Sequence, residues 1–483
     1  MNLNELTIKE AKEGFKKKKF SSVDLTKACL EQIKKHNKSL NAFITVCEEE
    51  ALESARKADE IISNLTRSNV ADAIQQLNNY PLLGIPIALK DLFSTKGVKT
   101  TAGSKVLENY IPPFDATVVK KLKDAGAVII GKTNLDAWGH GASGENSDFG
   151  PTKNPWNTEY VPGGSSSGSA AALASDMCLA ATGTDTGGSI RLPASFCSVV
   201  GLKPTYGRVS RYGIIAMASS LDSIGHFTKS VEDSAIFFNV TAGKDNFDAT
   251  TSAVGVQNYT KNLNNRVKGI KIGVPKEYII KGLNKNVQTG FEQTLKVFEK
   301  LGAIIEDVSL PHTEYGIAVY YIIQPSEVSS NLANDDGIRY GNNRSYFGDQ
   351  AKRRIMLGTY TLSAGYYDAY YKKAMQVRTL IKRDFDEAFK RVDVIVTPVS
   401  PTPPWKLGEK VSDPLKMYLS DIFTVTANLA GIPGLSIPIG FTNGLPVGMQ
   451  ILGPQFSEGL LFQIGYAYEQ ETEWHMKRPF LSP

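Results

Sequence analysis

Short apolar runs alternate with amphipathic, helix-like segments along most of this chain. The runs predict buried strands at residues 83–89, 127–130, 179–182, 270–274, 303–308 and 392–397. The segments around them predict helices at 118–123, 169–174, 287–301 and 360–391, and residues 1–64 also read as helices, one of them at 48–62. Strands that alternate with helices indicate a sheet covered by helices, which is an α/β fold.

Turn and capping signals refine this pattern. Ser21 and Asp24 have capping-box spacing ahead of a helix that runs to about residue 35. Thr442-Asn443-Gly444 separates apolar runs at 435–441 and 447–452, which predicts a β-hairpin. Residues 66–80 and 245–265 are polar and aperiodic, so we expect a surface loop and a connection there.

Residues 161–191 are rich in glycine, serine and alanine and contain two Gly-Gly-Ser turns, at 163–165 and 187–189. Such a stretch is often a linker, but the apolar residues at 170–173 and 177–181 need burial. The stretch lacks the lysine that a phosphate-binding loop requires, so it does not match that motif. The G-x-S-x-G motif, which forms the nucleophile elbow of hydrolases, is also absent. A serine on a tight glycine turn, with backbone N–H groups beside it, is suited to nucleophilic acyl transfer.

Three separated motifs resemble the amidase signature family. The first motif in the chain is Gly84-Ile85-Pro86-Ile87-Ala88-Leu89-Lys90-Asp91. The second is Gly163-Gly164-Ser165-Ser166-Ser167-Gly168-Ser169. The third is Asp185-Thr186-Gly187-Gly188-Ser189-Ile190-Arg191, in which Ser189 stands 24 residues after Ser165. The resemblance runs from about residue 11 to the end of the chain. It implies one large α/β/α domain over 1–483 around a mixed sheet, with an N-terminal helical segment (1–64), a catalytic core (84–230), and the remaining sheet, substrate pocket and C-terminal helix (266–483).

The resemblance also assigns chemistry residue by residue. It makes Ser189 the nucleophile, Ser165 a bridging serine after a cis peptide bond to Gly164, and Lys90 the base. Lys90 must be neutral to accept a proton, and burial lowers the pKa of a lysine. The backbone at Thr186, Gly187 and Gly188 forms the expected oxyanion hole, while Asp185 and Arg191 form a bracing ion pair. No metal site is implied.

Within the family, the segments 201–213, 336–341, 352–359 and 363–373 resemble the glutaminase subunits of glutamyl-tRNA(Gln) amidotransferases. That resemblance implies that Arg354 binds the substrate carboxylate, that Asp421 binds the substrate ammonium group, and that Tyr320 lines the pocket. It implies partner subunits B and C, with charged tRNA, ATP and magnesium bound mainly by the first of these partners and no cofactor in this chain. A stand-alone amidase for a small amide and a catalytically silent scaffold are the alternatives.

Four positions depart from the family pattern. Ser167 stands where glycine is usual, His226 where proline is usual, and Gln324-Pro325 where smaller residues are usual. With serine in place of glycine at position 167, the resemblance does not fix the backbone angles of that turn. His226 is expected to have a structural role. The Gln324-Pro325 departure weakens the resemblance on which the assignment of the substrate pocket residues depends.

The bulk composition adds exclusions. The net charge of +5 over 483 residues, with no long basic tract, does not predict autonomous nucleic-acid binding. The four cysteines lack C-x-x-C spacing, and we expect free thiols in a reducing compartment. We see no stretch of about 18 apolar residues and no signal-peptide pattern, so we expect a cytoplasmic protein without a membrane span.

Overall fold

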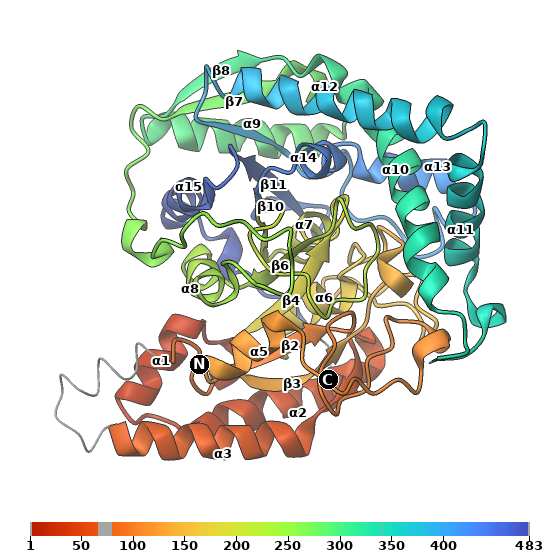
Figure 1. Cartoon of the computed structure of the whole chain (residues 1–483). Helices are drawn as coiled ribbons and strands as arrows, with labels where there is room; N and C mark the ends of the chain where they lie inside the picture. The colour runs from red at the N-terminus through yellow and green to blue at the C-terminus, as the bar shows by residue number, and fades with distance from the viewer. Residues whose placement is uncertain (1, 66–79, 340, 482–483) are drawn as a thin grey trace.

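The computed structural model describes residues 2–65, 80–339 and 341–481. Within these residues a single mixed sheet has the strand order β1-β3-β2-β4-β6-β5-β10-β11-β9-β7-β8. Its strands are β1 (Phe43–Val46), β2 (Pro86–Lys90), β3 (Val128–Thr133), β4 (Ala180–Asp185), β5 (Val200–Lys203), β6 (Ser223–Thr228), β7 (Lys271–Pro275), β8 (Ile304–Val308), β9 (Val394–Pro398), β10 (Gly434–Thr442) and β11 (Leu445–Leu452). Figure 1 shows the sheet passing from β3 and β2 near the bottom of the view to β7 and β8 at the top.

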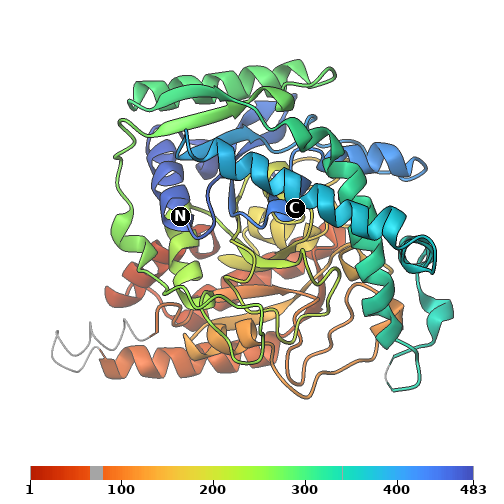
Figure 2. The same ribbon diagram turned by 45° about the horizontal axis from the view of Figure 1, so that its top comes forward.

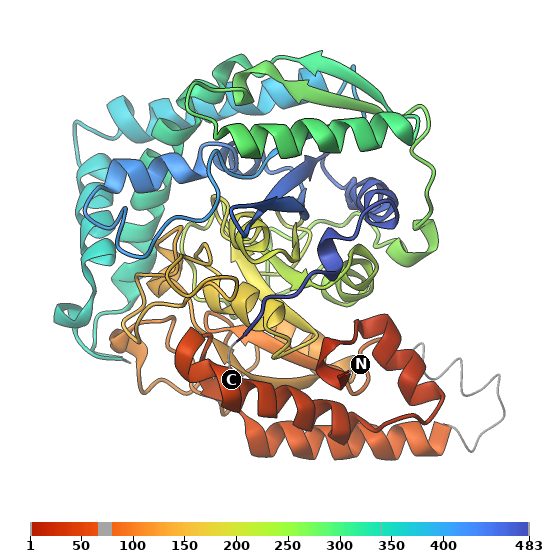
Figure 3. The ribbon, with the colours of Figure 1, turned by 180° about the vertical axis from the view of Figure 1, so that it is seen from behind.

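Helices cover both faces of this sheet. They are α1 (Ile8–Lys16), α2 (Ser22–Leu40), α3 (Glu48–Leu65), α5 (Thr117–Asp124), α6 (Ser167–Ala174), α7 (Arg191–Cys197), α8 (Val231–Thr241), α9 (Lys285–Lys300), α10 (Gly316–Asn331), α11 (Asp349–Leu362), α12 (Lys373–Ala388), α13 (Pro414–Tyr418), α14 (Val425–Ala430) and α15 (Glu458–Gln470). Figure 2 shows α12 on the front, and Figure 3 shows α9 covering β7 and β8 from behind. The expected α/β fold around a mixed sheet is confirmed.

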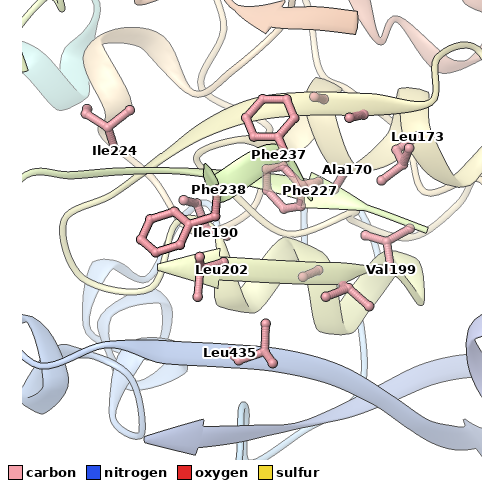
Figure 4. Packing of buried hydrophobic residues seen from close by; sticks show 14 of the residues in the cluster. Ala170, Leu173, Ile190, Val199, Leu202, Ile224, Phe227, Phe237, Phe238 and Leu435 are labelled. Carbon is pink, nitrogen blue, oxygen red and sulfur yellow. The ribbon is translucent and has the colours of Figure 1, made fainter. Parts of the chain in front are cut away.

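Two kinds of pairing make the sheet mixed. β2 pairs in parallel with β3 and β4, and β7 pairs in parallel with β8 and β9. The central strands β6, β5, β10 and β11 are antiparallel to their neighbours. Side chains of the central strands and of α8 form the core shown in Figure 4, where Phe237 and Phe238 lie near Phe227.

Local signals in the sequence account for several elements. The Ser21–Asp24 capping box starts α2, and Ser21 Oγ accepts from the Asp24 N–H. Asn443 and Gly444 both have positive φ in the turn between β10 and β11, as a tight hairpin of this kind requires. The loop predicted at 66–80 lies almost wholly outside the described residues.

The single long helix predicted at 360–391 is wrong. α11 ends at Leu362, Ser363 is extended, and Gly365 takes a φ of +86°. A new helix then begins with a π-helical turn at Asp368–Lys372 and continues as α12. Gly365 breaks the run because a positive φ is available to glycine at little cost, while the aromatic periodicity on either side of it hides the break.

Some elements were not predicted from the apolar pattern. They include the strands β1 and β6 and the helices α7, α8, α10, α13 and α14. The C-terminal helix that the resemblance implies is present as α15. In the described part of the chain, no helix combines the length and the apolar character needed to cross a membrane.

Candidate active site

Lys90 is the last residue of β2, a strand buried along its whole length. Its side chain is fully buried, and the Nζ donates to Ser165 Oγ at 2.8 Å, Ser166 Oγ at 2.9 Å and Thr184 Oγ1 at 2.8 Å. Burial lowers the pKa of Lys90 to about 7, although nearby carboxylates, Asp136 foremost, oppose this. A lysine in this state exchanges a proton near neutral pH, which suits a general base.

The two Gly-Gly-Ser turns meet beside Lys90. The Gly164–Ser165 peptide bond is cis, as the resemblance implies. Ser165 lies shortly before α6 and Ser189 shortly before α7, and the Ser166 N–H donates to the Ser189 carbonyl at 3.3 Å. Sequence motifs 24 residues apart therefore share one site, at the ends of β2 and β4.

Ser189 is the more accessible of the two serines. Its exposure is 8%, against 1% for Ser165. Among the hydrogen bonds of the described residues, Lys90 Nζ is the donor to Ser165 Oγ, and none joins Ser165 Oγ to Ser189 Oγ. Catalytic hydrogen bonds often tighten only once substrate is bound, so this arrangement accommodates a chain of proton transfers from Ser189 to Lys90.

Asp185 occupies one of the three backbone N–H donors expected to form the oxyanion hole. The Gly188 N–H donates to Asp185 Oδ1 at 2.9 Å, so this group already has an acceptor. The backbone N–H groups of Thr186 and Gly187 remain as the donors of the predicted set. A Cβ built at Gly187 would lie 2.6 Å from the Tyr320 ring, so only glycine allows the turn to approach the pocket wall this closely.

The Asp185–Arg191 pair braces this turn. Both residues are fully buried, and Arg191 Nη2 lies 3.1 Å from Asp185 Oδ1. Burial alone raises the pKa of Asp185, but the Arg191 charge and hydrogen bonds outweigh it and bring that pKa to about 2. Arg191 also donates to Gln450 and Asn428, which ties the turn to β11 and α14. The predicted ion pair is thus present in the structure.

Arg354 projects from α11 into a second part of the site. It is 4% exposed; its Nε donates to Gln324 Oε1 at 3.3 Å and its Nη1 to Gln350 Oε1 at 2.8 Å. Gln324 belongs to the unusual Gln324-Pro325 pair, so this departure places an acceptor behind the guanidinium. Among the described residues Arg354 forms no ion pair with a carboxylate, and its hydrogen bonds go to amide oxygens of Gln324 and Gln350. Its charge is therefore available to an anionic ligand.

Asp421 supplies the opposite charge. It is 9% exposed, and Tyr321 Oη donates to its Oδ2 at 3.0 Å. Burial raises the pKa of Asp421 to about 7. Thr424, three residues after Asp421, donates from Oγ1 to the Gly187 carbonyl at 2.6 Å. Tyr321, which donates to Asp421, also lines a small cavity together with Arg354. Arg354, Asp421 and the nucleophile turn are therefore connected through Tyr321 and Thr424.

Comparisons with known proteins agree with this geometry. The amidase family model matches residues 24–462. The chain belongs to the amidase family. The A subunit of the glutamyl-tRNA(Gln) amidotransferase of Carboxydothermus hydrogenoformans is 52% identical over 496 residues, with both chains covered completely. The crystal structure of the corresponding glutamyl-tRNA(Gln) amidotransferase subunit from Thermotoga maritima has a TM-score of 0.81 at 44% identity, covering 98% of this chain and 96% of that one.

Amidases with other printed activities share the fold. The native peptide amidase from Stenotrophomonas maltophilia has a TM-score of 0.81 at 30% identity, covering 97% of each chain. The fold of this chain is thus shared with an amidase of a different name.

Two departures from the amidase pattern are accommodated structurally. Ser167 is the first residue of α6, where it needs no positive φ, and its Oγ donates to Thr152 Oγ1 at 3.2 Å. His226 lies in the middle of β6, fully buried, with Nε2 2.7 Å from Ser234 Oγ. Burial lowers the pKa of His226 to about 3. Both residues play packing roles in this structure.

Sequence reasoning missed two residues of this amidase site. Tyr321 contacts Asp421 and stacks on Tyr418 with ring centroids 3.7 Å apart. Lys410 lines the same small cavity as Arg354 and Tyr321, and its Nζ lies over the Trp405 ring. The Tyr320-Tyr321 pair was a signal for the first residue, whereas no motif marks Lys410.

Proposed function

We propose that this chain is the glutaminase subunit of a glutamyl-tRNA(Gln) amidotransferase, and that its ammonia converts Glu-tRNA(Gln) to Gln-tRNA(Gln). The observation that carries the hydrolytic half is the buried contact of Lys90 with Ser165 beside Ser189. The substrate assignment is supported by full-length relatives that bear the name of this subunit at 52% identity.

The reaction begins at Ser189. Its Oγ forms a bond to the carboxamide carbon of glutamine while its proton passes to Ser165 Oγ, whose own proton passes to Lys90 Nζ. The negative oxygen of the tetrahedral intermediate accepts hydrogen bonds from backbone N–H groups of the turn at Thr186 and Gly187. Because burial holds the pKa of Lys90 at about 7, the same group accepts this proton and later returns it.

Collapse of the intermediate breaks the carbon–nitrogen bond. Ser165 gives a proton to the departing nitrogen and takes one back from Lys90, so ammonia leaves and an acyl ester remains on Ser189. Water then attacks the ester carbon and gives a proton to the Ser165–Lys90 pair. The proton returns to Ser189 Oγ as the ester bond breaks, which releases glutamate and restores the site.

Glutamine is a zwitterion, and the pocket offers a matching pair of charges. Arg354 is suited to the α-carboxylate because its planar group can bind both oxygens. Asp421 is suited to the α-ammonium group, whose charge favours the ionised carboxylate and so lowers its pKa from the raised value. A stand-alone amidase for an apolar amide has no use for two buried charges at these positions, since each is costly to desolvate.

The remaining chemistry belongs to other subunits in this proposal. Subunits B and C complete a heterotrimer, and ATP, magnesium and charged tRNA are bound mainly by the first of these two. The weak net charge of +5 supports this division, since non-specific tRNA affinity arises from basic residues that neutralise phosphates. The complex works in the cytoplasm, a location supported by four buried cysteines that are free thiols.

Reconstitution tests the proposal. Glutaminase rate and Gln-tRNA formation are measured for the isolated chain and for the complex with subunits B and C, Glu-tRNA(Gln) and ATP. We expect glutamine hydrolysis to rise in the complete mixture and Gln-tRNA to form only there. Conversion of Glu-tRNA(Gln) by the isolated chain, or a complex that forms no Gln-tRNA, would favour the stand-alone amidase instead.

A further inference from the structure

A buried histidine that the mechanism does not use lies next to the catalytic centre. His140 is 1% exposed, and in the described part of the chain neither its Nδ1 nor its Nε2 has a hydrogen-bond partner. His226, which is also buried, differs in that its Nε2 lies 2.7 Å from Ser234 Oγ. A buried polar group without a partner is costly, so it requires an explanation. A ligand that binds beside His140 would supply the missing partner.

The turn that carries His140 lies against the bridging serine. It begins at Asp136, shortly after β3, and the Asp136 N–H donates to the Ser165 carbonyl at 3.2 Å. A Cβ built at Gly139 would lie 3.7 Å from Ser165 Oγ. The residue immediately before His140 therefore adjoins the catalytic centre.

The residues that follow His140 reach the cavity at Arg354. Gly141 and Ala142 line this cavity together with Arg354. The Ala142 carbonyl also accepts from the Gly164 N–H at 2.9 Å, which ties this backbone to the first Gly-Gly-Ser turn. His140 thus joins the backbone beside the bridging serine to the backbone that lines the Arg354 cavity.

The backbone around His140 is held in an uncommon conformation. Trp138 takes a φ of +60°, in the left-handed region that a bulky side chain seldom adopts. Its N–H donates to the Ala102 carbonyl at 2.8 Å, and its ring packs against Phe347 with ring centroids 5.3 Å apart. Asn146 Nδ2 donates to the His140 carbonyl at 3.1 Å. Such conformations persist only where surrounding contacts enforce them, and they cluster at ligand-binding sites.

The charge of Arg354 acts on His140. Burial lowers the pKa of His140 well below its ordinary value, and the positive charge of Arg354 lowers it further. The imidazole is therefore neutral near pH 7, where one ring nitrogen donates a hydrogen bond and the other accepts one. A neutral N–H donor close to a guanidinium that lacks a carboxylate partner is suited to an anionic ligand.

We propose that His140 is a specificity-determining residue whose ring N–H donates a hydrogen bond to the α-carboxylate of glutamine, beside Arg354. This inference rests on the proposed function. Arg354 supplies the charge that attracts the carboxylate, and His140 supplies a donor that is satisfied only when a carboxylate is bound. An amide without this group leaves the buried donor unpaired, and a site built to hydrogen-bond its substrate rejects such analogues strongly.

The first test compares two amides in one variant. His140→Phe keeps a ring of similar size and removes both ring nitrogens. Its kcat/KM for glutamine should fall by at least about tenfold, because a hydrogen bond to a charged group is lost, and the change should lie in KM more than in kcat. Its kcat/KM for 4-aminobutanamide, which is glutamine without the α-carboxylate, should stay unchanged. The control is His36→Phe, at a buried histidine on α2, which should leave both values unchanged.

A second measurement needs no turnover of either amide. In a Ser189→Ala background glutamine binds without hydrolysis, so calorimetry gives its Kd directly. The added His140→Phe change should raise the Kd for glutamine by at least about tenfold and leave the Kd for 4-aminobutanamide unchanged. Circular dichroism checks the fold of each variant, and His140→Leu, which also lacks ring nitrogens, replaces His140→Phe where the latter does not fold.

The outcomes separate the role of His140 from the proposed function. If the unmodified complex forms Gln-tRNA while His140→Phe binds and hydrolyses glutamine normally, His140 only fills space, so this inference is wrong and the function stands. Equal losses for glutamine and 4-aminobutanamide would place the effect in the catalytic centre and would also overturn it. If the unmodified complex forms no Gln-tRNA and the chain does not distinguish the two amides, the proposed function fails together with this inference.

Discussion

The catalytic centre and the substrate wall of this amidase are built in different ways. Lys90, Ser165 and Ser189 lie at the ends of β2 and β4 or on turns beside them, and the sheet and its covering helices enclose them. Arg354 lies on α11, and Asp421 lies on the short 3-10 turn Leu419–Asp421 that directly follows α13. Figure 1 shows α11 and α13 at one side of the molecule. The sheet thus positions the catalytic residues, whereas helices packed outside it position Arg354 and Asp421, the proposed substrate-binding residues.

The difference shows how one fold carries several activities. Polar groups of the catalytic centre are paired with one another, as in the Asp185–Arg191 bridge, so any change there leaves a buried partner unsatisfied. On the substrate wall, Arg354 is held by three neutral amide oxygens, one from Gln324 and two from Gln350, and Asp421 is held by one tyrosine hydroxyl. Neither residue has a counter-charge among these partners, so replacing one of them leaves no partner ion uncompensated.

The largest effect should follow removal of the nucleophile. Ser189→Ala is expected to reduce glutamine hydrolysis by at least about 10⁴-fold, to the background rate, because no other hydroxyl occupies its place on the turn. Ammonia release by the purified variant measures this, with circular dichroism to show an unchanged fold. Ser195→Ala, at a buried serine on α7, is the control and should retain activity. Substantial residual hydrolysis would remove Ser189 as the nucleophile.

Breaking the bracing pair should cost stability more than any surface change. Arg191→Met leaves Asp185 buried with its charge uncompensated, so we expect the free energy of unfolding to fall by about 3–5 kcal/mol. Urea denaturation measures the change. Lys120→Met is the matched control, because the side chains of its ion pair with Asp124 are 69% and 62% exposed and should contribute less than about 1 kcal/mol. Equal losses in the two variants would show that Asp185–Arg191 is not a special brace.

On the substrate wall, Arg354→Ala should act on recognition and leave the fold intact. Loss of the carboxylate contact is expected to lower kcat/KM for glutamine by about 2–5 kcal/mol in transition-state stabilisation, a factor of about 30 or more. Lys352→Ala, at an exposed position two residues earlier on α11, should leave kcat/KM unchanged. An unchanged kcat/KM in Arg354→Ala contradicts its assignment to the α-carboxylate.

The same contrast explains what the sequence could and could not predict. The triad and the Asp185–Arg191 pair were predicted because contiguous motifs around Lys90, Ser165 and Ser189 resemble those of the amidase signature family. The hairpin at Asn443-Gly444 was predictable because a tight turn of this kind requires positive φ at both residues. Tyr321 and Lys410 reach the site only through the packing of α10 and the segment before α13, and no local pattern records such packing.

Helix breaks and antiparallel strands show a second limit. The predicted helix at 360–391 ignored Gly365, since the tyrosines on both sides keep an amphipathic spacing. β6 contains Gly225 and His226, residues that lower the apolar signal of a strand that is nevertheless buried at every position. The helix break is decided locally, by the positive φ of Gly365. In β6 the deciding factor is tertiary, because a Cβ built at Gly225 would lie 2.0 Å from the Leu202 carbonyl oxygen of β5, so only glycine allows this approach.

The smallest expected effect is a pH dependence of kcat and kcat/KM. It distinguishes the ionisation of Lys90 in the catalytic centre from that of Asp421 on the substrate wall. Burial lowers the pKa of Lys90 to about 7 and raises that of Asp421 to about 7, so both active forms, neutral lysine and ionised aspartate, are gained as pH rises through about 7. kcat/KM for glutamine should therefore fall below about pH 7, by up to about tenfold per pH unit for each group that must lose a proton. Bound glutamine keeps its ammonium group against Asp421 and holds that carboxylate ionised, so kcat should report Lys90 alone.

The control is Asp421→Asn assayed over the same pH range: its kcat profile should keep the inflection near about 7, whereas its kcat/KM profile should lose one of the two ionisations. A kcat that stays flat from about pH 6 to about pH 8 in both enzymes would show that Lys90 is not the base, and loss of the kcat inflection in Asp421→Asn would transfer that ionisation from the catalytic centre to the substrate wall.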